Sequence, residues 1–337
     1  MAVSIAGRLE HPPLLLLLAD GRQHSGEKLA QALKVSRGSV WKSVERLRAL
    51  GLEVQAVPRR GYRLPNPVEL LDVRRIEAQL QSERAGRLNK LELLFDVDST
   101  NSRLLAAPPP PAGQTDVCMA ELQHAGRGRR GRRWIAPFGG SVALSLAWSF
   151  AGQAQVSALS LAAGVAVWRA LVRAGAHGVT LKWPNDIWYA DRKIGGVLTE
   201  LRGESGGPLH AVIGVGLNVS LGEATRKKIE ASGVAVATVA DACAAAPSRN
   251  LVAGALLDEL LRMLVEFERV GFGAFREAWM ALDALGGRPA KVLLGPSVIS
   301  GTARGVDEEG ALWLETPERM QRFVSGEASL RVLEDDS

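Results

Sequence analysis

The sequence predicts an α+β fold built from three successive units. Short amphipathic helices dominate the first 66 residues, strand-like and helical segments then mix without strict alternation, and the last fifty residues contain only short strands. A chain of 337 residues with 47% hydrophobic and 23% charged residues can bury a large core and is long enough for several domains. We expect a helical domain at 1–66, a mixed-sheet domain covered by helices at 67–285, and a small β-barrel at 286–337.

The first unit reads as three helices followed by a hairpin. The run "PPLLLLLAD" is too short for a membrane span and lacks a small-residue cleavage site, so it predicts a buried helix ended by Gly21 and a protein without membrane association. The next two helices begin after Ser25 and Ser36, which are good N-caps, and the third ends at Gly51. In that third helix, Val40, Val44 and Leu47 recur at helical spacing as its buried stripe.

The basic charge of the chain is concentrated in this first unit. Residues 1–66 hold eleven Lys and Arg against five Asp and Glu, while the whole chain carries a net charge of +5. The segment "LEVQAVPRRGYRL" predicts two short strands around a basic turn. This outline indicates a winged helix-turn-helix, whose second helix enters the major groove while its wing meets the DNA backbone. The residues expected to contact DNA are Arg37, Ser39, Lys42, Ser43, Arg46, Arg59 and Arg60. An ordinary helical domain with solvated arginines is the alternative.

A linker with two prolines at 64–72 leads into the central unit. The strand candidates there are "LELLFDV", "VCMAEL", "SVALSLAWSF", "VTLKW", "KIGGVLTEL" and "HAVIGVGLNV". Helical periodicity marks a segment that ends at Gly175, and the segments 250–270 and 273–284. From residue 286 onward, "AKVLL", "SGTARGVD" and "GALWLE" are short strands separated by turns, as in a small all-β barrel.

The chain holds two cysteines, Cys118 and Cys243, and neither belongs to a pairing or metal-binding motif. They predict two buried apolar side chains in a reducing compartment, and therefore a cytoplasmic protein.

The most unusual segment is "AGRGRRGRRW" at 125–134, which lies between two predicted strands. Spaced glycines let backbone amides approach an anion, arginine forks pair with carboxylate or phosphate oxygens, and Trp134 can stack on a planar base. Alone, this segment could be a mobile basic surface loop. Polar or glycine-rich segments also occur at the ends of other strands, namely "DSTN" at 98–101, "KWPND" at 182–186, "RKIGG" at 192–196 and "GVGLN" at 214–218. Together they predict one anion-binding site at the sheet.

The motifs "DSTN", "GRGRRGR-W", "KWPND" and "RKIGGVL", in this order, resemble the biotin protein ligases. The resemblance is closest to the bifunctional bacterial type that also represses the biotin operon, and it covers essentially the whole chain. It implies a central domain of the biotin/lipoate ligase type and an SH3-like C-terminal barrel. It also implies a reaction in which biotin and ATP give biotinyl-5′-adenylate, followed by transfer of biotin to a lysine of the biotin carboxyl carrier protein of acetyl-CoA carboxylase.

The resemblance also implies roles for individual residues. The expected catalytic residues are Lys193, which would bridge the biotin carboxylate and the α-phosphate, Arg129 and Asp186. The expected biotin contacts are Ser99, Thr100, Asn101, Gln123, Gly126, Arg127, Arg129, Lys193 and Gly196. The expected adenylate contacts are Arg129, Arg130, Arg132, Trp134, Lys182, Asn185, Lys193 and Asn218. Mg²⁺ is expected as the cation bound to ATP, without a dedicated protein site. His124 stands where relatives often carry glutamine and is left out of the site.

The resemblance implies three partners: the carrier protein, operator DNA of biotin biosynthesis genes, and a second copy of the chain when adenylate is bound. Two other functions stay open. One is a lipoate-type protein ligase, and the other is a ligand-sensing transcription factor without ligase activity.

Overall fold

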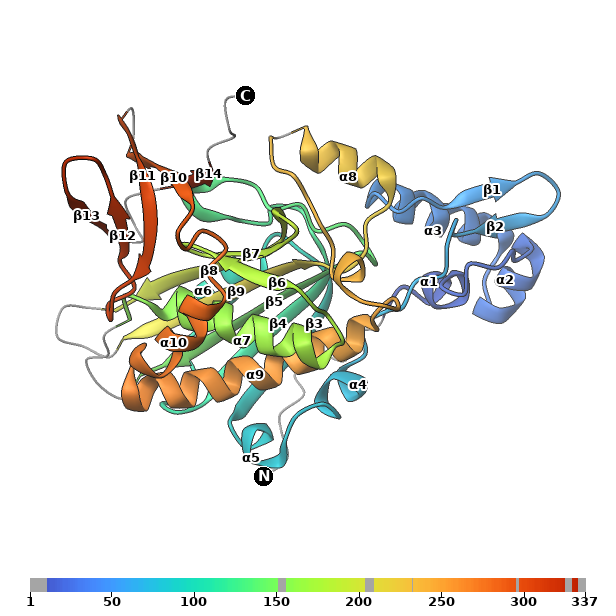
Figure 1. Ribbon diagram of the computed structural model, residues 1–337. Helices are drawn as coiled ribbons and strands as arrows, with labels where there is room; N and C mark the ends of the chain where they lie inside the picture. Colours follow the sequence, from blue (N-terminus) through green and yellow to red (C-terminus); the bar gives the residue numbers. More distant parts are fainter. Residues whose placement is uncertain are drawn as a thin grey trace.

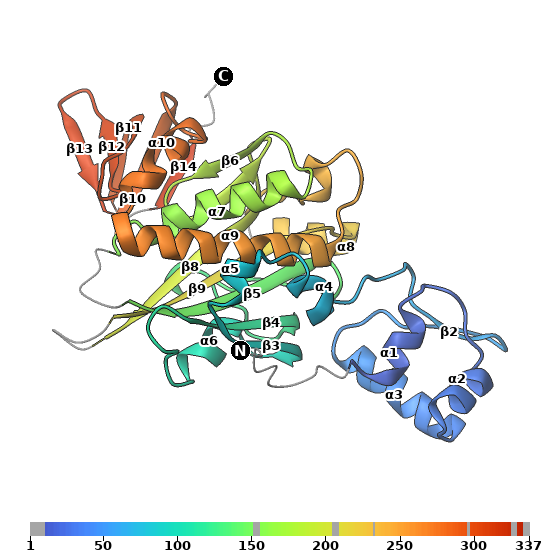
Figure 2. The ribbon, with the colours of Figure 1, turned by 90° about the horizontal axis from the view of Figure 1, so that it is seen from below.

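A computed structural model describes residues 11–150, 156–203, 209–231, 233–294, 297–324 and 329–332. The three units lie in a row, with a large mixed sheet in the middle, the helical unit at one end and the C-terminal strands at the other (Figures 1 and 2). Among the described helices, none is long and apolar enough to cross a lipid bilayer.

The N-terminal unit is a helix-turn-helix with a two-stranded wing. Its elements are α1 (Pro13–Leu18), α2 (Gly26–Leu33), α3 (Arg37–Ala49), β1 (Gln55–Val57) and β2 (Gly61–Arg63). The predicted caps are confirmed, because the Ser25 side chain accepts a hydrogen bond from the Lys28 amide and the Ser36 side chain accepts one from the Ser39 amide. The predicted apolar stripe of α3 is buried as well.

The core of this unit continues into the central domain. Leu15, Val44 and Leu64 belong to the same cluster of packed side chains as Leu122 of the central sheet, and Phe138 packs against this cluster. Burial of apolar surface therefore joins the winged unit to the sheet domain.

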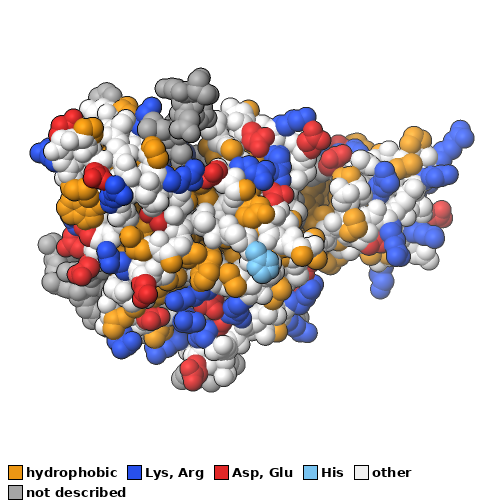
Figure 3. Space-filling view, in the orientation of Figure 1, with side chains coloured by type: hydrophobic (Ala, Val, Ile, Leu, Met, Phe, Trp, Pro, Cys, Tyr) orange, Lys and Arg blue, Asp and Glu red, His pale blue; other side chains and the backbone are white. Residues whose placement is uncertain are grey.

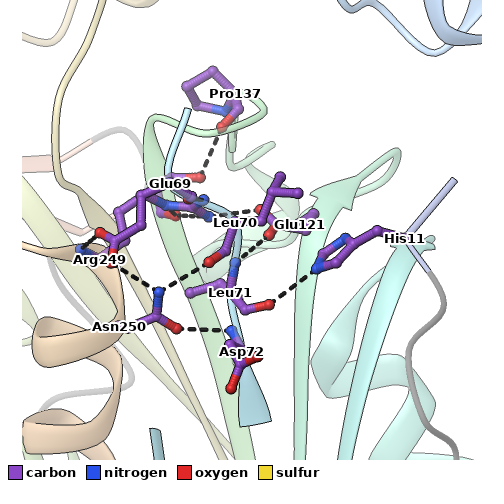
Figure 4. Close-up of polar contacts among 10 residues, drawn as sticks. His11, Glu69, Leu70, Leu71, Asp72, Glu121, Pro137, Arg249 and Asn250 are labelled. Atoms are coloured by element: carbon purple, nitrogen blue, oxygen red, sulfur yellow. Dashed lines mark hydrogen bonds and ion pairs between the residues drawn. The ribbon is translucent and has the colours of Figure 1, made fainter. Parts of the chain in front are cut away.

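The linker between the two units is held by a buried polar cluster at the start of α9 (Figure 4). Arg249 forms an ion pair with Glu121 at 2.8 Å, and both side chains are almost fully buried. The backbone amide of Arg249 donates to Glu69 at 2.6 Å, and its guanidinium donates to the Glu69 carbonyl at 2.6 Å. Leu71 N–H donates to Glu121 at 2.6 Å, while Asn250 exchanges hydrogen bonds with the linker backbone. We call these five residues, Glu69, Leu71, Glu121, Arg249 and Asn250, the linker clasp.

The central sheet has seven strands in the order β3-β4-β5-β9-β8-β7-β6, in which only β3 and β4 are parallel. The strands are β3 (Leu88–Val97), β4 (Thr115–Gln123), β5 (Ser141–Ser149), β6 (Val179–Lys182), β7 (Asp186–Tyr189), β8 (Arg192–Arg202) and β9 (His210–Asn218). The sequence does not predict strand β7, because "KWPND" and "RKIGG" indicate only the end of one strand and the start of the next. The β7–β8 turn places Ala190 and Asp191 at positive φ without the usual Asn-Gly or Asp-Gly signal.

Helices cover both faces of the sheet, as the α+β prediction requires. Helices α7 and α9 pack together on one face, and α6 lies on the opposite face against β4, β5 and β9 (Figure 2). The helices of this domain are α4 (Val73–Glu77), α5 (Ser82–Ala85), α6 (Thr100–Leu105), α7 (Leu159–Arg173), α8 (Glu223–Glu230), α9 (Arg249–Val270) and α10 (Gly273–Ala281). Two single 3₁₀ turns occur at Arg129–Gly131 and Ala240–Ala242.

The C-terminal unit is a five-stranded antiparallel sheet in the order β13-β12-β11-β10-β14, which confirms the predicted small all-β unit. Its strands are β10 (Pro289–Leu294), β11 (Ser297–Val306), β12 (Leu312–Glu315), β13 (Met320–Phe323) and β14 (Ser329–Val332). Val306 and Leu312 of this unit belong to the same packed core as α7 and α9. Polar contacts also join it to the central domain near β6 and β7. The Trp183 indole donates to the Gly310 carbonyl at 3.0 Å, and Arg288 pairs with Asp191 at 2.8 Å.

Candidate active site and nucleic-acid interface

A cleft of about 990 Å³ lies over β8 and β9, between the start of α6 and the basic loop 125–134. It brings together segments that are far apart in the sequence. The predicted residues that line it are Ser99, Thr100, Asn101, Gln123, Arg127, Arg129, Arg130, Arg132, Trp134, Lys182, Asn185, Asp186, Lys193, Gly196 and Asn218. The four motifs therefore meet at one site.

Gly126 is the one predicted contact that does not line this cleft. A Cβ at this position would lie 2.5 Å from the carbonyl oxygen of Trp134. The Trp134 amide also donates to the Gly126 carbonyl at 2.8 Å. Gly126 therefore permits the close approach of the two ends of the basic loop.

One end of the cleft is a buried polar pocket at the start of α6. Ser99 caps this helix. The Thr100 amide donates to the Gln123 side chain at 2.8 Å, while the Ser145 hydroxyl lies 2.7 Å from the Thr100 hydroxyl and 2.5 Å from Asn101 Oδ1. Thr100, Asn101 and Ser145 are all less than 5% exposed. These fixed hydroxyl and amide groups suit a small ligand that offers both donors and acceptors.

The middle of the cleft holds a lysine and an aspartate on neighbouring strands. Lys193 Nζ lies 2.6 Å from Asp186 Oδ1, and both side chains are about one quarter exposed. Gly196 leaves the space above them open, since a Cβ there would lie 3.4 Å from both groups. The Lys193 ammonium also lies 5.8 Å from the centre of the Trp134 ring. This lysine can neutralise an anion that enters the cleft.

The basic loop forms a small hairpin that closes one side of the cleft. Gly128 N–H donates to the Arg132 carbonyl at 2.7 Å, and Arg130 at the tip has a positive φ. Arg129 Nη1 donates to Asn185 Oδ1 at 3.4 Å. Burial, together with the adjacent positive charge of Arg130, lowers the pKa of Arg129. Like charges are thus held close together here, which raises the affinity of the cleft for anions.

The Trp134 indole lies against the backbone of β9. A Cβ on Gly216 would lie 2.5 Å from the indole, so glycine is required beneath the ring. Trp134 Nε1 and Asn218 Oδ1 are buried and have no hydrogen-bond partner in the described part of the chain. An aromatic face next to an unpaired amide oxygen fits a planar base that carries an amino group.

The cleft also contains residues that the sequence did not reveal. They are Ser145, Trp188, Asp191, Arg288 and the segment 233–236. Ser145 lies within a fully buried strand, so its hydroxyl gives no signal in the hydropathy pattern. Arg288 comes from the start of the C-terminal unit, far from every motif. His124 does not line the cleft and lies 3.2 Å from Asp96 on the surface.

The winged unit carries a separate basic surface. Arg37, Ser39, Lys42 and Arg46 are exposed on α3, where Ser43 is half-buried, and Arg59 and Arg60 are exposed at the tip of the wing. Figure 3 shows Lys and Arg side chains gathered over this end of the molecule. All predicted DNA-contacting residues thus belong to the helix and the turn that such domains present to DNA.

A helix-turn-helix unit joined to a mixed-sheet domain with a cationic, tryptophan-lined cleft defines a class of protein: an anion-binding enzyme fused to a DNA-binding module. Three family models match the chain and agree with this class. They are the HTH domain at residues 13–63, the Biotin/lipoate A/B protein ligase family at 95–218 and the Biotin protein ligase C terminal domain at 285–331.

Known proteins narrow this class to one family. The chain is 39% identical over 325 residues to the bifunctional ligase/repressor BirA of Salmonella typhimurium, covering 95% of this chain and 97% of that protein. It is 38% identical to BirA of Escherichia coli with the same coverage. The biotin protein ligase from Aquifex aeolicus in complex with biotin and ATP matches 72% of this chain and 99% of its own, at 28% identity and a TM-score of 0.60. The chain belongs to the biotin protein ligase family.

Proposed function

We propose that this chain joins biotin to the biotin carboxyl carrier protein of acetyl-CoA carboxylase in two steps, of which the first consumes ATP. First, a carboxylate oxygen of biotin attacks the α-phosphorus of ATP, and pyrophosphate leaves. Second, the amine of a carrier lysine attacks the acyl carbon, AMP leaves, and the amine loses a proton. The observation that carries the proposal is that Lys193, Arg129, Trp134 and the polar pocket at the start of α6 all line the same cleft.

Each part of the cleft suits one part of these substrates. The hydroxyl and amide groups of Thr100, Asn101 and Gln123 fit the polar ureido ring of biotin. Trp134 and Asn218 fit the adenine base, by stacking and by accepting a hydrogen bond from its amino group.

The charged centre suits the reacting groups. The biotin carboxylate and the α-phosphate are both anions, so their approach requires fixed positive charge in a poorly hydrated site. Lys193 lies in the middle of the cleft and can bridge the two, while Arg129 approaches from the loop. Asp186 holds the Lys193 ammonium before substrates bind. Mg²⁺ would enter bound to the phosphates of ATP.

The second part of the proposal is that the winged unit represses transcription in response to biotin. When acceptor protein is scarce, bound adenylate orders the basic loop, favours a homodimer, and places two winged units on operator DNA of biotin biosynthesis genes. The exposed basic residues of α3 and the wing support this role. We place the domain boundaries at 66/67 and 285/286. We place the protein in the cytoplasm, because both cysteines are free. Cys118 is buried as predicted, whereas the prediction was wrong for Cys243, which is only half-buried.

Replacement of Lys193 by alanine tests the catalytic half. We expect Lys193→Ala to lower biotin-dependent exchange of pyrophosphate into ATP by a factor of about 100 or more, because charge stabilisation in the transition state is lost. Lys90→Ala is the matched control, since Lys90 lies on β3 and does not line the cleft. Exchange that survives in Lys193→Ala at the level of the control would refute the mechanism.

The mass of the acceptor domain decides between the possible ligases. We incubate the intact chain with ATP, an acceptor domain and either biotin or lipoate. The acceptor should gain the mass of a biotinyl group in the sample with biotin and no mass in the sample with lipoate. Addition of lipoate would favour the lipoate-type alternative, and no addition from either acid would favour a ligand-sensing transcription factor. Operator binding that is independent of biotin and ATP would refute the regulatory half.

A further inference from the structure

A continuous chain of side-chain contacts connects the root of the basic loop to its first arginine. The contacts start at Gln123, at the end of β4, pass through other elements, and end at Arg127, which is only four positions after Gln123 in the sequence. Its members, in order, are Gln123, Thr100, Ser145, Asn101, Glu200 and Arg127. Glu200 of β8 is the only acidic residue among these six, and neither the sequence motifs nor the proposed reaction gives it a role.

The two carboxylate oxygens of Glu200 bind different partners. Glu200 Oε2 accepts from Asn101 Nδ2 at 2.9 Å, and Glu200 Oε1 forms a short ion pair with Arg127 Nη2. The Arg127 guanidinium also donates to the Ser102 hydroxyl at 3.2 Å. Glu200 is 21% exposed on β8 and Arg127 is 43% exposed in the loop, so the ion pair joins the loop to the sheet beside the cleft.

Asn101 makes the wall side of this bridge rigid. Its side chain is 3% exposed, and a Cβ on Gly214 would lie 2.0 Å from its Oδ1. Because Asn101 fills the space above Gly214 and also contacts Ser145, it has no room to turn. Glu200 is thereby held in one orientation, which lowers the entropy lost when it binds Arg127.

The position of Arg127 decides what this anchor does. The backbone of Arg127 forms an antiparallel β-bridge with that of Arg133 at the base of the loop hairpin, and Trp134 follows directly in the sequence. Fixing Arg127 to β8 therefore fixes the hairpin that carries Trp134 and Arg129. We propose that Glu200 is a positioning residue that anchors the basic loop over the cleft through Arg127.

A second ion pair in the same region provides a control. Glu92 of β3 pairs with Arg103 of α6 at 2.9 Å and is 12% exposed. It resembles the Glu200 pair in chemistry and in its link between a strand and a neighbouring segment, but it does not touch the loop. If any loss of a carboxylate near α6 loosened the protein, Glu92→Gln would reproduce the effect of Glu200→Gln.

The first measurement needs no ligand. Trypsin cleaves after arginine, and Arg127, Arg130, Arg132 and Arg133 are exposed in the loop. We expect the isosteric Glu200→Gln variant of the full chain to be cleaved within 125–134 at least 5-fold faster than the wild type, with fragments identified by mass. Glu92→Gln should be cleaved at the wild-type rate. Equal rates for Glu200→Gln and wild type, or equal acceleration by both variants, would overturn the proposal.

The second measurement concerns the reaction and rests on the proposed function. In biotin-dependent pyrophosphate exchange, Glu200→Gln should raise KM for biotin about 5- to 10-fold and change kcat less than 2-fold, since hydrogen bonds to charged groups supply this range of free energy. Glu92→Gln should leave both constants unchanged. Faster loop cleavage without a change in KM would overturn the positioning role, whereas absence of exchange in the wild type would refute the proposed function instead.

Discussion

Arginine is used in opposite ways in the linker clasp and in the basic loop. Arg249 is 4% exposed, and its guanidinium donates to Glu121 and to the carbonyls of Glu69 and Ser141. Arg129, by contrast, lines the cleft and lies beside the positive charge of Arg130. In the linker clasp the guanidinium forms its hydrogen bonds with other residues of the fold. In the basic loop the positive charge faces the cleft. The same residue type therefore predicts stability in one region and ligand affinity in the other.

We expect the largest effect on stability from a substitution that breaks the linker clasp. Arg249→Met should lower the free energy of unfolding by about 3–5 kcal/mol, because removal of one partner leaves a buried carboxylate without its counter-charge. Urea unfolding followed by circular dichroism measures this change. Arg304→Met is the control, since its pair with Glu315 is about half exposed on both sides and should contribute about 1 kcal/mol or less. Similar losses of unfolding free energy in both variants would show that the buried ion pair of the linker clasp contributes no more than an exposed one.

The corresponding change in the loop should cost activity. Arg129→Met should slow adenylate formation about 100-fold while leaving stability within about 1 kcal/mol of the wild type. Burial and the positive charge of Arg130 lower the pKa of Arg129, so we do not expect its charge to stabilise the fold. Pyrophosphate exchange and urea unfolding on the same samples test both halves. A loss of stability comparable to that of Arg249→Met would contradict the comparison.

Acid should weaken the clasp through Glu69. Burial alone would raise the pKa of Glu69, but hydrogen bonds from Asn250, Ser248 and the Arg249 amide outweigh it, so the pKa lies below the ordinary value of 4.5. The stabilisation is thus complete above pH 4.5 and is lost as the pH falls through the lowered pKa. We expect Glu69→Gln to cost about 1–2 kcal/mol at pH 7, and this difference should shrink toward zero in acid. A difference that is constant from pH 7 to pH 3 would contradict this explanation.

The smallest effect concerns an exposed arginine of the wing. Arg60→Ala should weaken binding to any duplex DNA about 5-fold and reduce the salt dependence of binding by about one ion. Titration of a fluorescent duplex at several salt concentrations measures both quantities. Unfolding should be unchanged, because Arg60 is exposed. Unchanged DNA affinity would remove Arg60 from the interface.

The sequence predicted elements whose signals are local. Ser25 and Ser36 start helices through hydrogen bonds that span three residues, and the strands next to the four motifs are long and apolar. The site was predictable for the same reason, since each motif lies at the end of such an element. The family resemblance then assigned roles that physical chemistry alone left open.

The contacts that the sequence did not predict depend on distant partners. Glu69 and Arg249 lie 180 positions apart, and Glu200 meets Arg127 across 73 positions. A glutamate within a strand pattern reads as solvent-facing, so nothing near Glu200 indicates its role. Strand β7 was missed because it has four residues and its turn lacks glycine. Such features follow from the packing of the whole sheet.

The shared core of the winged unit has a consequence for how two chains would read DNA. Since Leu122 and Phe138 belong to the same packed cluster as side chains of α1 and α3, we expect apolar packing to restrict rotation of the recognition helix about its linker. In a pair of chains, the distance and angle between the two recognition helices would then be set by the contact between the sheet domains. Spacing of half-sites on the double helix becomes a property of the enzyme's surface, and a substitution there could change the preferred operator length without touching a single DNA contact.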